Sequence, residues 1–135
     1  MYLLDTNVVS ELRKKRPHGA VLAWLKTVAA DDIYLSAVTL GELQAGVEAL
    51  RRRDAGKADE IEAWIDQLAE THQVLPMDGP LFRDWARLMD QRSDQLIEDA
   101  MIAATARAHR LTLVTRNTRD FKPFDVPLFN PFAGT

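Results

Sequence analysis

The sequence predicts an α/β fold with a mostly parallel central sheet of four to five strands and helices on both faces. Two observations support this prediction. Short apolar runs of strand length alternate along the chain with longer segments whose apolar residues recur at helical spacing. Strands that alternate with helices favour a parallel sheet between two helical layers. The length of 135 residues, without a repeat, linker or low-complexity tract, predicts one domain over residues 1–135.

The N-terminal half is expected to contain two strands and four helices. Tyr2–Leu4 and Ile33–Leu35 are short apolar runs of strand length. The segments that follow them carry an apolar residue at every third or fourth position, and that spacing predicts helices. The expected helices are a short one around Val8, Val9 and Leu12 that stops near Pro17, followed by His18–Ala30, Thr39–Arg53 and Ala58–Glu70.

The C-terminal half is expected to contain two more strands, two helices and an edge strand. Val74–Leu75 is a short strand, and Pro80 suits the first turn of the helix that follows it. Glu98–His109 is apolar almost all round, which predicts a buried helix. The last strong strand is Leu111–Thr115, and the tail from Phe121 to Phe132, which mixes Phe and Pro, is expected to form one short edge strand.

The composition excludes several classes of protein. Apolar residues make up 47% of the chain and charged residues 27%, which is typical of a globular domain rather than a disordered one. The absence of cysteine excludes disulfides, zinc-thiolate sites and thiol nucleophiles. No segment approaches the roughly 20 apolar residues of a membrane span, and no signal peptide is recognisable before the first strand. We therefore expect a soluble, cytoplasmic protein without a membrane partner.

Four carboxylates lie where predicted strands give way to helices. Asp5 follows the first strand, Glu42 lies one turn into the helix after the second, Asp99 begins the buried helix, and Asp120 follows the last strong strand. The carboxyl ends of parallel strands meet at one edge of a sheet, so these residues are expected to converge there. Two carboxylates about 4 Å apart repel by roughly 4 kcal/mol at an effective dielectric near 20. The cluster therefore predicts a site for a divalent cation.

Each of the four carboxylates also has a purely structural explanation. Asp5 suits the N-cap of a helix, and Asp99, like its neighbour Glu98, suits the positive end of a helix dipole. Asp120 suits a turn, and Glu42 suits an exposed ion pair. The convergence of all four residues on one predicted edge favours a shared site over four separate explanations.

Basic residues are bunched along the chain, although the net charge is −3. The bunches are Arg13–Arg16, Arg51–Arg53, and Arg116, Arg119 and Lys122. Basic side chains beside an acidic pocket are compatible with holding a polyanion while a metal ion supports the chemistry. The alternative is that each bunch is a solvated helix end or loop. That alternative is weaker for Arg116 and Arg119, which flank Asp120.

Four segments of the chain, taken together and in order, resemble a known family. They are Leu4–Leu12 (LDTNVVSEL), Ser36–Leu43 (SAVTLGEL), Glu98–Ala106 (EDAMIAATA) and Leu113–Phe121 (LVTRNTRDF). Over essentially the whole chain they resemble the PIN-domain proteins of the VapC toxin type, the ribonuclease half of type II toxin–antitoxin pairs. The resemblance implies a PIN-like three-layer α/β/α domain and a metal-dependent endoribonuclease.

The resemblance implies metal-binding roles for the four carboxylates. Asp5, Glu42, Asp99 and Asp120 match the acidic positions of the family, which hold Mg²⁺ with Mn²⁺ as a substitute. Asp5 and Asp99 are expected to be the primary ligands. Glu42 is expected to bind the metal or orient a water molecule, and Asp120 is expected to complete the site. Glu98 is either a helix-start charge or a ligand that acts through water.

Polar residues beside the carboxylates match further positions of the family. Thr6 and Thr115 match positions next to the metal pocket, and the Thr115 hydroxyl is expected to form a hydrogen bond with water or phosphate during catalysis. Asn7 and Asn117 match positions that shape the pocket. The resemblance therefore implies a catalytic set of Asp5, Glu42, Asp99, Asp120 and Thr115.

The resemblance also implies partners. It predicts an RNA substrate, with Arg116 and Arg119 as candidate contacts to its backbone, and a cognate antitoxin whose tail covers the pocket. It further predicts a homodimer that joins in a higher assembly with the antitoxin.

Two other interpretations of the acidic set remain. One is a catalytically inactive PIN-like binding partner, and the complete acidic set argues against it. The other is a phosphatase or phospho-receiver. Asn7 argues against that class because a second Asp is expected there, and no Lys directly follows the last strong strand.

Overall fold

The central element of the computed structural model is a parallel sheet of five strands, in the order β3-β2-β1-β4-β5. The strands are β1 (Tyr2–Leu4), β2 (Ile33–Ser36), β3 (Gln73–Leu75), β4 (Thr112–Val114) and β5 (Leu128–Phe129). All four strand pairings are parallel. The tail contributes the short edge strand that the sequence predicts. The structure describes residues 1–133, so the last two residues of the expected domain, 134 and 135, lie outside the described residues.

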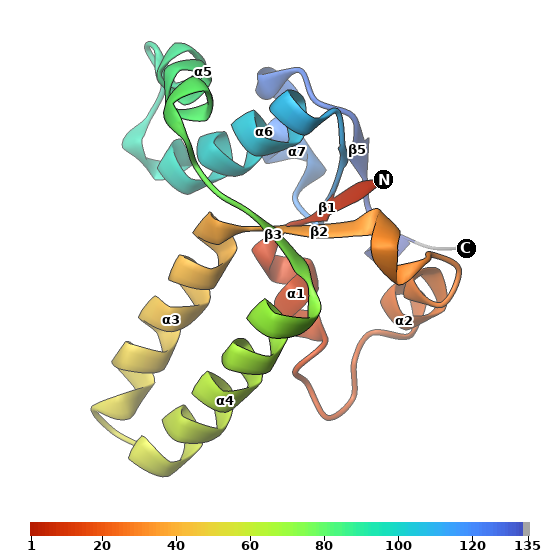
Figure 1. The fold of residues 1–135 in the computed structure, drawn as a ribbon, viewed down its shortest axis with the longest axis vertical. Helices are drawn as coiled ribbons and strands as arrows, with labels where there is room; N and C mark the ends of the chain where they lie inside the picture. The colour runs from red at the N-terminus through yellow and green to blue at the C-terminus, as the bar shows by residue number, and fades with distance from the viewer. Residues whose placement is uncertain (134–135) are drawn as a thin grey trace.

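Helices cover both faces of the sheet (Figure 1). They are α1 (Thr6–Glu11), α2 (Gly19–Leu25), α3 (Ala37–Arg51), α4 (Ala55–Thr71), α5 (Gly79–Met89), α6 (Ile97–His109) and α7 (Thr118–Phe121). Helices α5, α6 and α7 lie on one side of the sheet, and α1 to α4 lie on the other. The predicted α/β/α architecture is therefore confirmed. Within residues 1–133, no helix combines the length and the apolar character that crossing a bilayer requires.

Two hydrophobic clusters flank the sheet, because successive strand residues point to opposite faces. Leu3 of β1 packs with residues of α6, and its neighbour Leu4 packs with residues of α1 and α2. Both side chains are at most 1% exposed. Six residues of α6 are buried, which confirms the predicted buried helix. A third cluster around Val47, Ala58 and Ile65 joins α3 to α4.

Side-chain caps place the starts of α3 and α4 earlier than the apolar spacing alone predicts. The Ser36 hydroxyl accepts a hydrogen bond from the Val38 amide, so α3 begins at Ala37. The Asp54 carboxylate accepts one from the Lys57 amide, so α4 begins at Ala55. The Ser36 cap places Glu42 in the second turn of α3, one turn into the helix as the sequence predicts.

The helix predicted over residues 18–30 is too long at its C-terminal end. Helix α2 ends at Leu25, and a short 3₁₀ turn at Ala30–Asp32 leads into β2. The Thr27 hydroxyl donates a hydrogen bond to the Trp24 carbonyl at 2.6 Å, and the Thr27 amide bonds the same carbonyl. These bonds replace the next helical turn. Val28 still packs against the cluster around Leu4, so the apolar spacing extends beyond the helix.

The assignment of the core predicts the cost of truncating Leu113. Leu113→Ala is expected to lower the free energy of unfolding by about 2–5 kcal/mol, because the side chain is fully buried between the sheet and α6. Urea denaturation measures this change. Phe82→Ala is the control, since Phe82 is 43% exposed on α5 and its truncation is expected to cost less than about 1 kcal/mol. Equal losses in the two variants would contradict this core.

Candidate active site

The register of the sheet brings three chain segments to one edge. Leu4 of β1 lies level with Leu35 of β2 and with Val114 of β4. The next residues, Asp5 and Thr115, therefore leave the sheet side by side, and β2 hands over to α3 at the same edge. The predicted convergence of strand ends thus holds for the segments that carry Asp5, Glu42 and Thr115.

Asp5 is a buried carboxylate held by three hydrogen-bond donors. Its side chain caps α1 by accepting from the Thr6 amide at 2.8 Å. The Thr115 hydroxyl donates to Asp5 Oδ2 at 2.7 Å, and Asn7 Nδ2 donates to the same oxygen at 3.2 Å. Asp5 is only 5% exposed. The structural role as an N-cap and the position in the acidic site are therefore combined in one residue.

Asn7 and Thr115 tie the loop after β4 to the start of α1. Asn7 Oδ1 accepts from the Arg116 amide at 3.2 Å, and Thr115 Oγ1 accepts from the Asn117 amide at 3.0 Å. The fully buried Thr115 hydroxyl thus donates its only hydrogen bond to Asp5. In this arrangement Thr115 orients a carboxylate, which differs from the contact with water or phosphate expected from the resemblance.

Thr6 links Glu42 to Asp5, because its hydroxyl bonds Glu42 and its amide bonds Asp5. The Thr6 hydroxyl donates to Glu42 Oε1 at 2.7 Å and lies 3.1 Å from the hydroxyl of Thr39. Thr39 is fully buried, and the sequence analysis did not include it among the site residues. A signal for it exists, because Thr39 lies three residues before Glu42 and so faces the same side of α3.

Asp99 and Asp120 approach the site from the other side of the sheet. Asp99 lies in the first turn of α6 and is half-buried, and its neighbour Glu98 is exposed. Asp120 lies on α7 rather than in an open loop, and it is exposed. The adjacent Phe121 is fully buried and anchors α7. Asp120 therefore lies at the rim of the site, while Asp5 lies at its base.

The carboxylates act on one another through their charges. Burial, and then repulsion from Asp5, Glu42, Asp120 and Glu98, raises the pKa of Asp99 to about 6. Burial raises the pKa of Asp5, against the hydrogen bonds from Thr115 and Thr6. Burial also raises the pKa of Glu42, with added repulsion from Asp5 and Glu98. Five carboxylates thus share one electrostatic environment, Glu98 included.

The donor set suits a hydrated hard cation. Within residues 1–133, no three Asp, Glu, His or Cys side chains are gathered closely enough to hold a metal ion between them. The groups that raise the pKa of Asp99 by their charge are all carboxylates. Mg²⁺ prefers oxygen ligands, keeps several of its waters and often needs only one or two carboxylates. The residues therefore fit Mg²⁺ better than a metal enclosed by protein ligands.

The basic residues expected near Asp120 differ in their surroundings. The Arg116 guanidinium lies over the ring of Phe132, 3.9 Å from its centroid, which restrains the side chain. Arg119 is exposed on α7 beside Asp120. Arg51, from another basic bunch, forms ion pairs with Glu48, Asp59 and Glu62 and fastens α3 to α4. Contacts of Arg116 and Arg119 with RNA remain a prediction.

Comparison with known proteins places the chain in a family context. The family model described as the PIN domain matches residues 2–126. Toxin FitB of Neisseria gonorrhoeae is 37% identical over 98% of this chain and 99% of its own length. VapC ribonuclease Y4jK of Sinorhizobium fredii is 39% identical over 98% of each chain. The crystal structure of FitAcB from Neisseria gonorrhoeae superposes with a TM-score of 0.87 at 35% identity, over 98% of this chain and 99% of that one.

The raised pKa of Asp99 predicts a pH-dependent stability in metal-free protein. The folded state, with a pKa of about 6, binds this proton more tightly than the unfolded chain, with a pKa of 3.8. The stabilisation that this proton gives the folded state is therefore complete below about pH 4, and it is lost as the pH rises through 6. Urea denaturation in EDTA at pH 4.5 and 7.5 should show that Asp99→Asn gains stability relative to the parent protein at the higher pH.

Asp66→Asn is the matched control for this measurement. Asp66 is an exposed carboxylate on α4 and takes no part in the acidic site. Its replacement should leave the pH dependence of the parent protein unchanged. If Asp99→Asn behaves like Asp66→Asn, the electrostatic description of the site is wrong.

Proposed function

The chain belongs to the PIN-domain family, and we propose that it is a Mg²⁺-dependent endoribonuclease of the VapC type that acts as the toxin of a toxin–antitoxin pair. The observation that carries this proposal is the cluster of carboxylates at one edge of the sheet, in which burial, and then repulsion from the neighbouring carboxylates, raises the pKa of Asp99 to about 6. The names of the two relatives, a toxin and a VapC ribonuclease, support the same function. The substrate class comes from these relatives and from the family.

The proposed metal-binding residues are Asp5, Glu42, Asp99 and Asp120, with Asp5 and Asp99 as the primary ligands and Mn²⁺ as a substitute for Mg²⁺. Because no three of these side chains are gathered around one point, the other two would act through the waters that Mg²⁺ keeps. When bound, Mg²⁺ would supply a positive charge that polarises a scissile phosphate and lowers the pKa of a bound water. An ionised carboxylate offers about four acceptor positions, and protein donors already occupy three positions of Asp5. Asp5 therefore has room for a single further contact, in a direction set by Thr115 and Asn7.

Glu42 and Asp99 are the more adaptable carboxylates of the site. Glu42 accepts one hydrogen bond, from Thr6, on Oε1, and its other oxygen is left for a cation or a water molecule. Asp99 is half-buried, and its pKa of about 6 in the metal-free protein would fall when a cation binds beside it, because an opposite charge favours the ionised carboxylate. These side chains can orient or deprotonate an attacking water, while Asp5 keeps a fixed position.

We also propose the partners and the surroundings in which the protein works. A toxin that cleaves RNA acts where RNA is present, which supports a cytoplasmic location. A host that carries such a toxin needs an inhibitor, which supports a cognate antitoxin that covers the acidic site. The homodimer and its higher assembly with the antitoxin remain predictions from the family resemblance. The single domain over residues 1–135 remains a prediction from the length of the chain.

Neutralising one metal ligand tests the proposed reaction. Asp5→Asn and Asp99→Asn are each expected to lower Mg²⁺-dependent RNA cleavage at least about 100-fold, because the metal contributes several kcal/mol to the transition state. Gel analysis of RNA incubated with antitoxin-free protein measures this loss, and circular dichroism checks the fold. Asp66→Asn should cleave like the parent protein. Full activity in both site variants would rule out the assignment. A parent protein that neither cleaves RNA nor binds Mg²⁺ would indicate a binding-only domain.

Co-expression tests the proposed antitoxin. The protein is expected to co-purify with a small protein encoded next to it, and the purified pair should cleave RNA at least about tenfold more slowly than the free protein. Size-exclusion chromatography and the same cleavage assay measure both effects. A neighbouring protein that neither binds nor inhibits would contradict the toxin–antitoxin assignment without affecting the nuclease assignment.

A further inference from the structure

A groove leads away from the acidic site along α3. It has a volume of about 430 Å³ and is lined by two site residues, Thr6 and Glu42, and by the basic residues Arg13 and Arg53. Its apolar lining includes Leu43, Leu50 and Ile61, which are only partly buried. Because Thr6 and Glu42 belong to both the groove and the site, the groove begins where the carboxylates converge. We call it the α3 groove.

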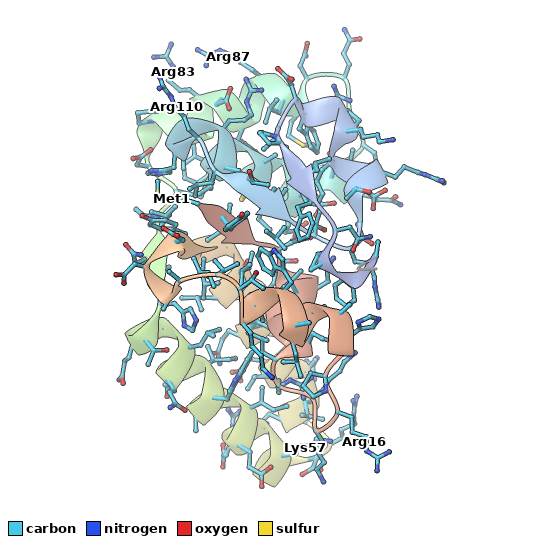
Figure 2. The ribbon with its side chains drawn as sticks, turned by 90° about the vertical axis from the view of Figure 1, so that its right-hand side faces the viewer. Met1, Arg16, Lys57, Arg83, Arg87 and Arg110 are labelled. Carbon is cyan, nitrogen blue, oxygen red and sulfur yellow. The ribbon has the colours of Figure 1, made fainter. Side chains whose placement is uncertain are left out.

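The α3 groove adjoins a second hollow with a strongly basic lining. This hollow, about 580 Å³, shares Arg13 and Ile61 with the α3 groove and adds Lys14, Lys15, Lys57, Glu60 and Trp64. The segment after α1 and the start of α4 supply these residues. Figure 2 shows Arg16 and Lys57, which come from these two segments, at the same end of the molecule. We call the α3 groove and this hollow together the basic channel.

Four cations of the basic channel are not used in the fold. In the part of the chain that the structure describes, Arg13, Lys15, Arg53 and Lys57 form no ion pair, and all four are exposed. Their neighbours Lys14 and Arg51 differ, since Lys14 pairs with Glu11 and Arg51 pairs with residues of α3 and α4. Unpaired cations around an apolar floor are available to a polyanion that also carries flat apolar groups.

The α3 groove is open at Gly46. Gly46 lines the α3 groove, and a Cβ atom added at this residue would meet no atom within 4 Å. Arg51 lies nine residues after Glu42 on α3, which is about 14 Å of helix at 1.5 Å per residue. The path from the acidic site to Arg53 therefore spans several nucleotides of a single strand.

We propose that the basic channel binds the single-stranded RNA that flanks the scissile phosphate on one side. This inference rests on the proposed nuclease function and assigns the path of its substrate. Phosphates would pair with Arg13, Arg53 and Lys57, and bases would lie on the apolar floor, which is the pattern of single-strand binding grooves. RNA is favoured over an acidic protein segment because the channel begins at Glu42, one of the residues that would hold the metal ion beside the reacting phosphate.

The test compares two double variants of equal charge. Arg53→Ala/Lys57→Ala removes two cations of the channel. Arg83→Ala/Arg87→Ala removes two exposed cations of α5, at the opposite end of the molecule (Figure 2). Cleavage kinetics are measured in Mg²⁺ with antitoxin-free protein, on a 20-nucleotide single-stranded RNA and on a 4-nucleotide RNA with the same cleavage site. The short RNA is too small to fill the channel.

The channel variant is expected to raise KM for the long RNA about tenfold, with kcat within about twofold of the parent protein. The slope of log KM against log salt concentration should fall by about 1.4, because each phosphate contact on a single strand contributes about 0.7. KM for the short RNA should not change. The α5 variant should behave like the parent protein on both RNAs.

Gly46→Trp provides a second variant that leaves the charge unchanged. It should also raise KM for the long RNA alone, because the indole fills the α3 groove, while circular dichroism should show an intact fold. Rescue by the smaller change Gly46→Ala would separate obstruction from damage to α3. If Gly46→Trp does not fold, the charge variants decide the question alone.

Three results would contradict the proposal that the basic channel binds RNA. They are an unchanged KM for the long RNA, an equal change in the α5 variant, and a loss of antitoxin binding with unchanged RNA kinetics, which would assign the channel to a protein segment. If the parent protein cleaves no RNA, the proposed function fails instead. Fluorescence anisotropy of the labelled 20-nucleotide RNA then still decides whether Arg53 and Lys57 bind it.

Discussion

The hydrogen bond from Thr115 to Asp5 is the interaction on which the site depends. It joins residues 110 positions apart in the chain, at the ends of two neighbouring strands. Asp5 is almost completely buried, and a buried carboxylate without hydrogen-bond donors would cost several kcal/mol. The pairing of β1 with β4 therefore places the Thr115 donor and at the same time makes the burial of Asp5 acceptable. Asn7 bonds both Asp5 and the Arg116 amide, and so forms a second connection between the ends of β1 and β4.

Function and stability oppose each other at this edge of the sheet. The fold brings together carboxylates that raise one another's pKa, and it tolerates them through capping, through threonine hydroxyls and through solvent at the rim. The burial increases from Asp120 at the rim to Asp5 at the base. A gradient of this kind gives one rigid ligand and several adaptable ones. That combination suits an ion that keeps part of its water shell.

The sequence predicted the parts of this structure that depend on local pattern. The strands and the buried helix α6 follow from apolar spacing, and the placement of Asp5 follows from the handover of β1 to α1. The same prediction is wrong for Asp99, because α6 follows α5 and a 3₁₀ turn at Asp94–Leu96 rather than a strand. The end of α2 was mispredicted, because Thr27 closes the helix while Val28 keeps the apolar spacing. The Thr6–Glu42 hydrogen bond and the basic channel depend on side chains from separate segments, so periodicity cannot reveal them.

The long separation between Asp5 and Thr115 also determines when the site can form during synthesis. Ribosomes release the chain from its N-terminus, and β1 lies in the middle of the sheet between β2 and β4. A nascent chain that has not yet released β4 holds Asp5 without its main side-chain donor, and α7 with Asp120 is still missing. Non-local strand pairing is also slow to form. The order of synthesis thus delays assembly of the acidic site until β4 and α7 have been released, and fragments that stop before them lack it.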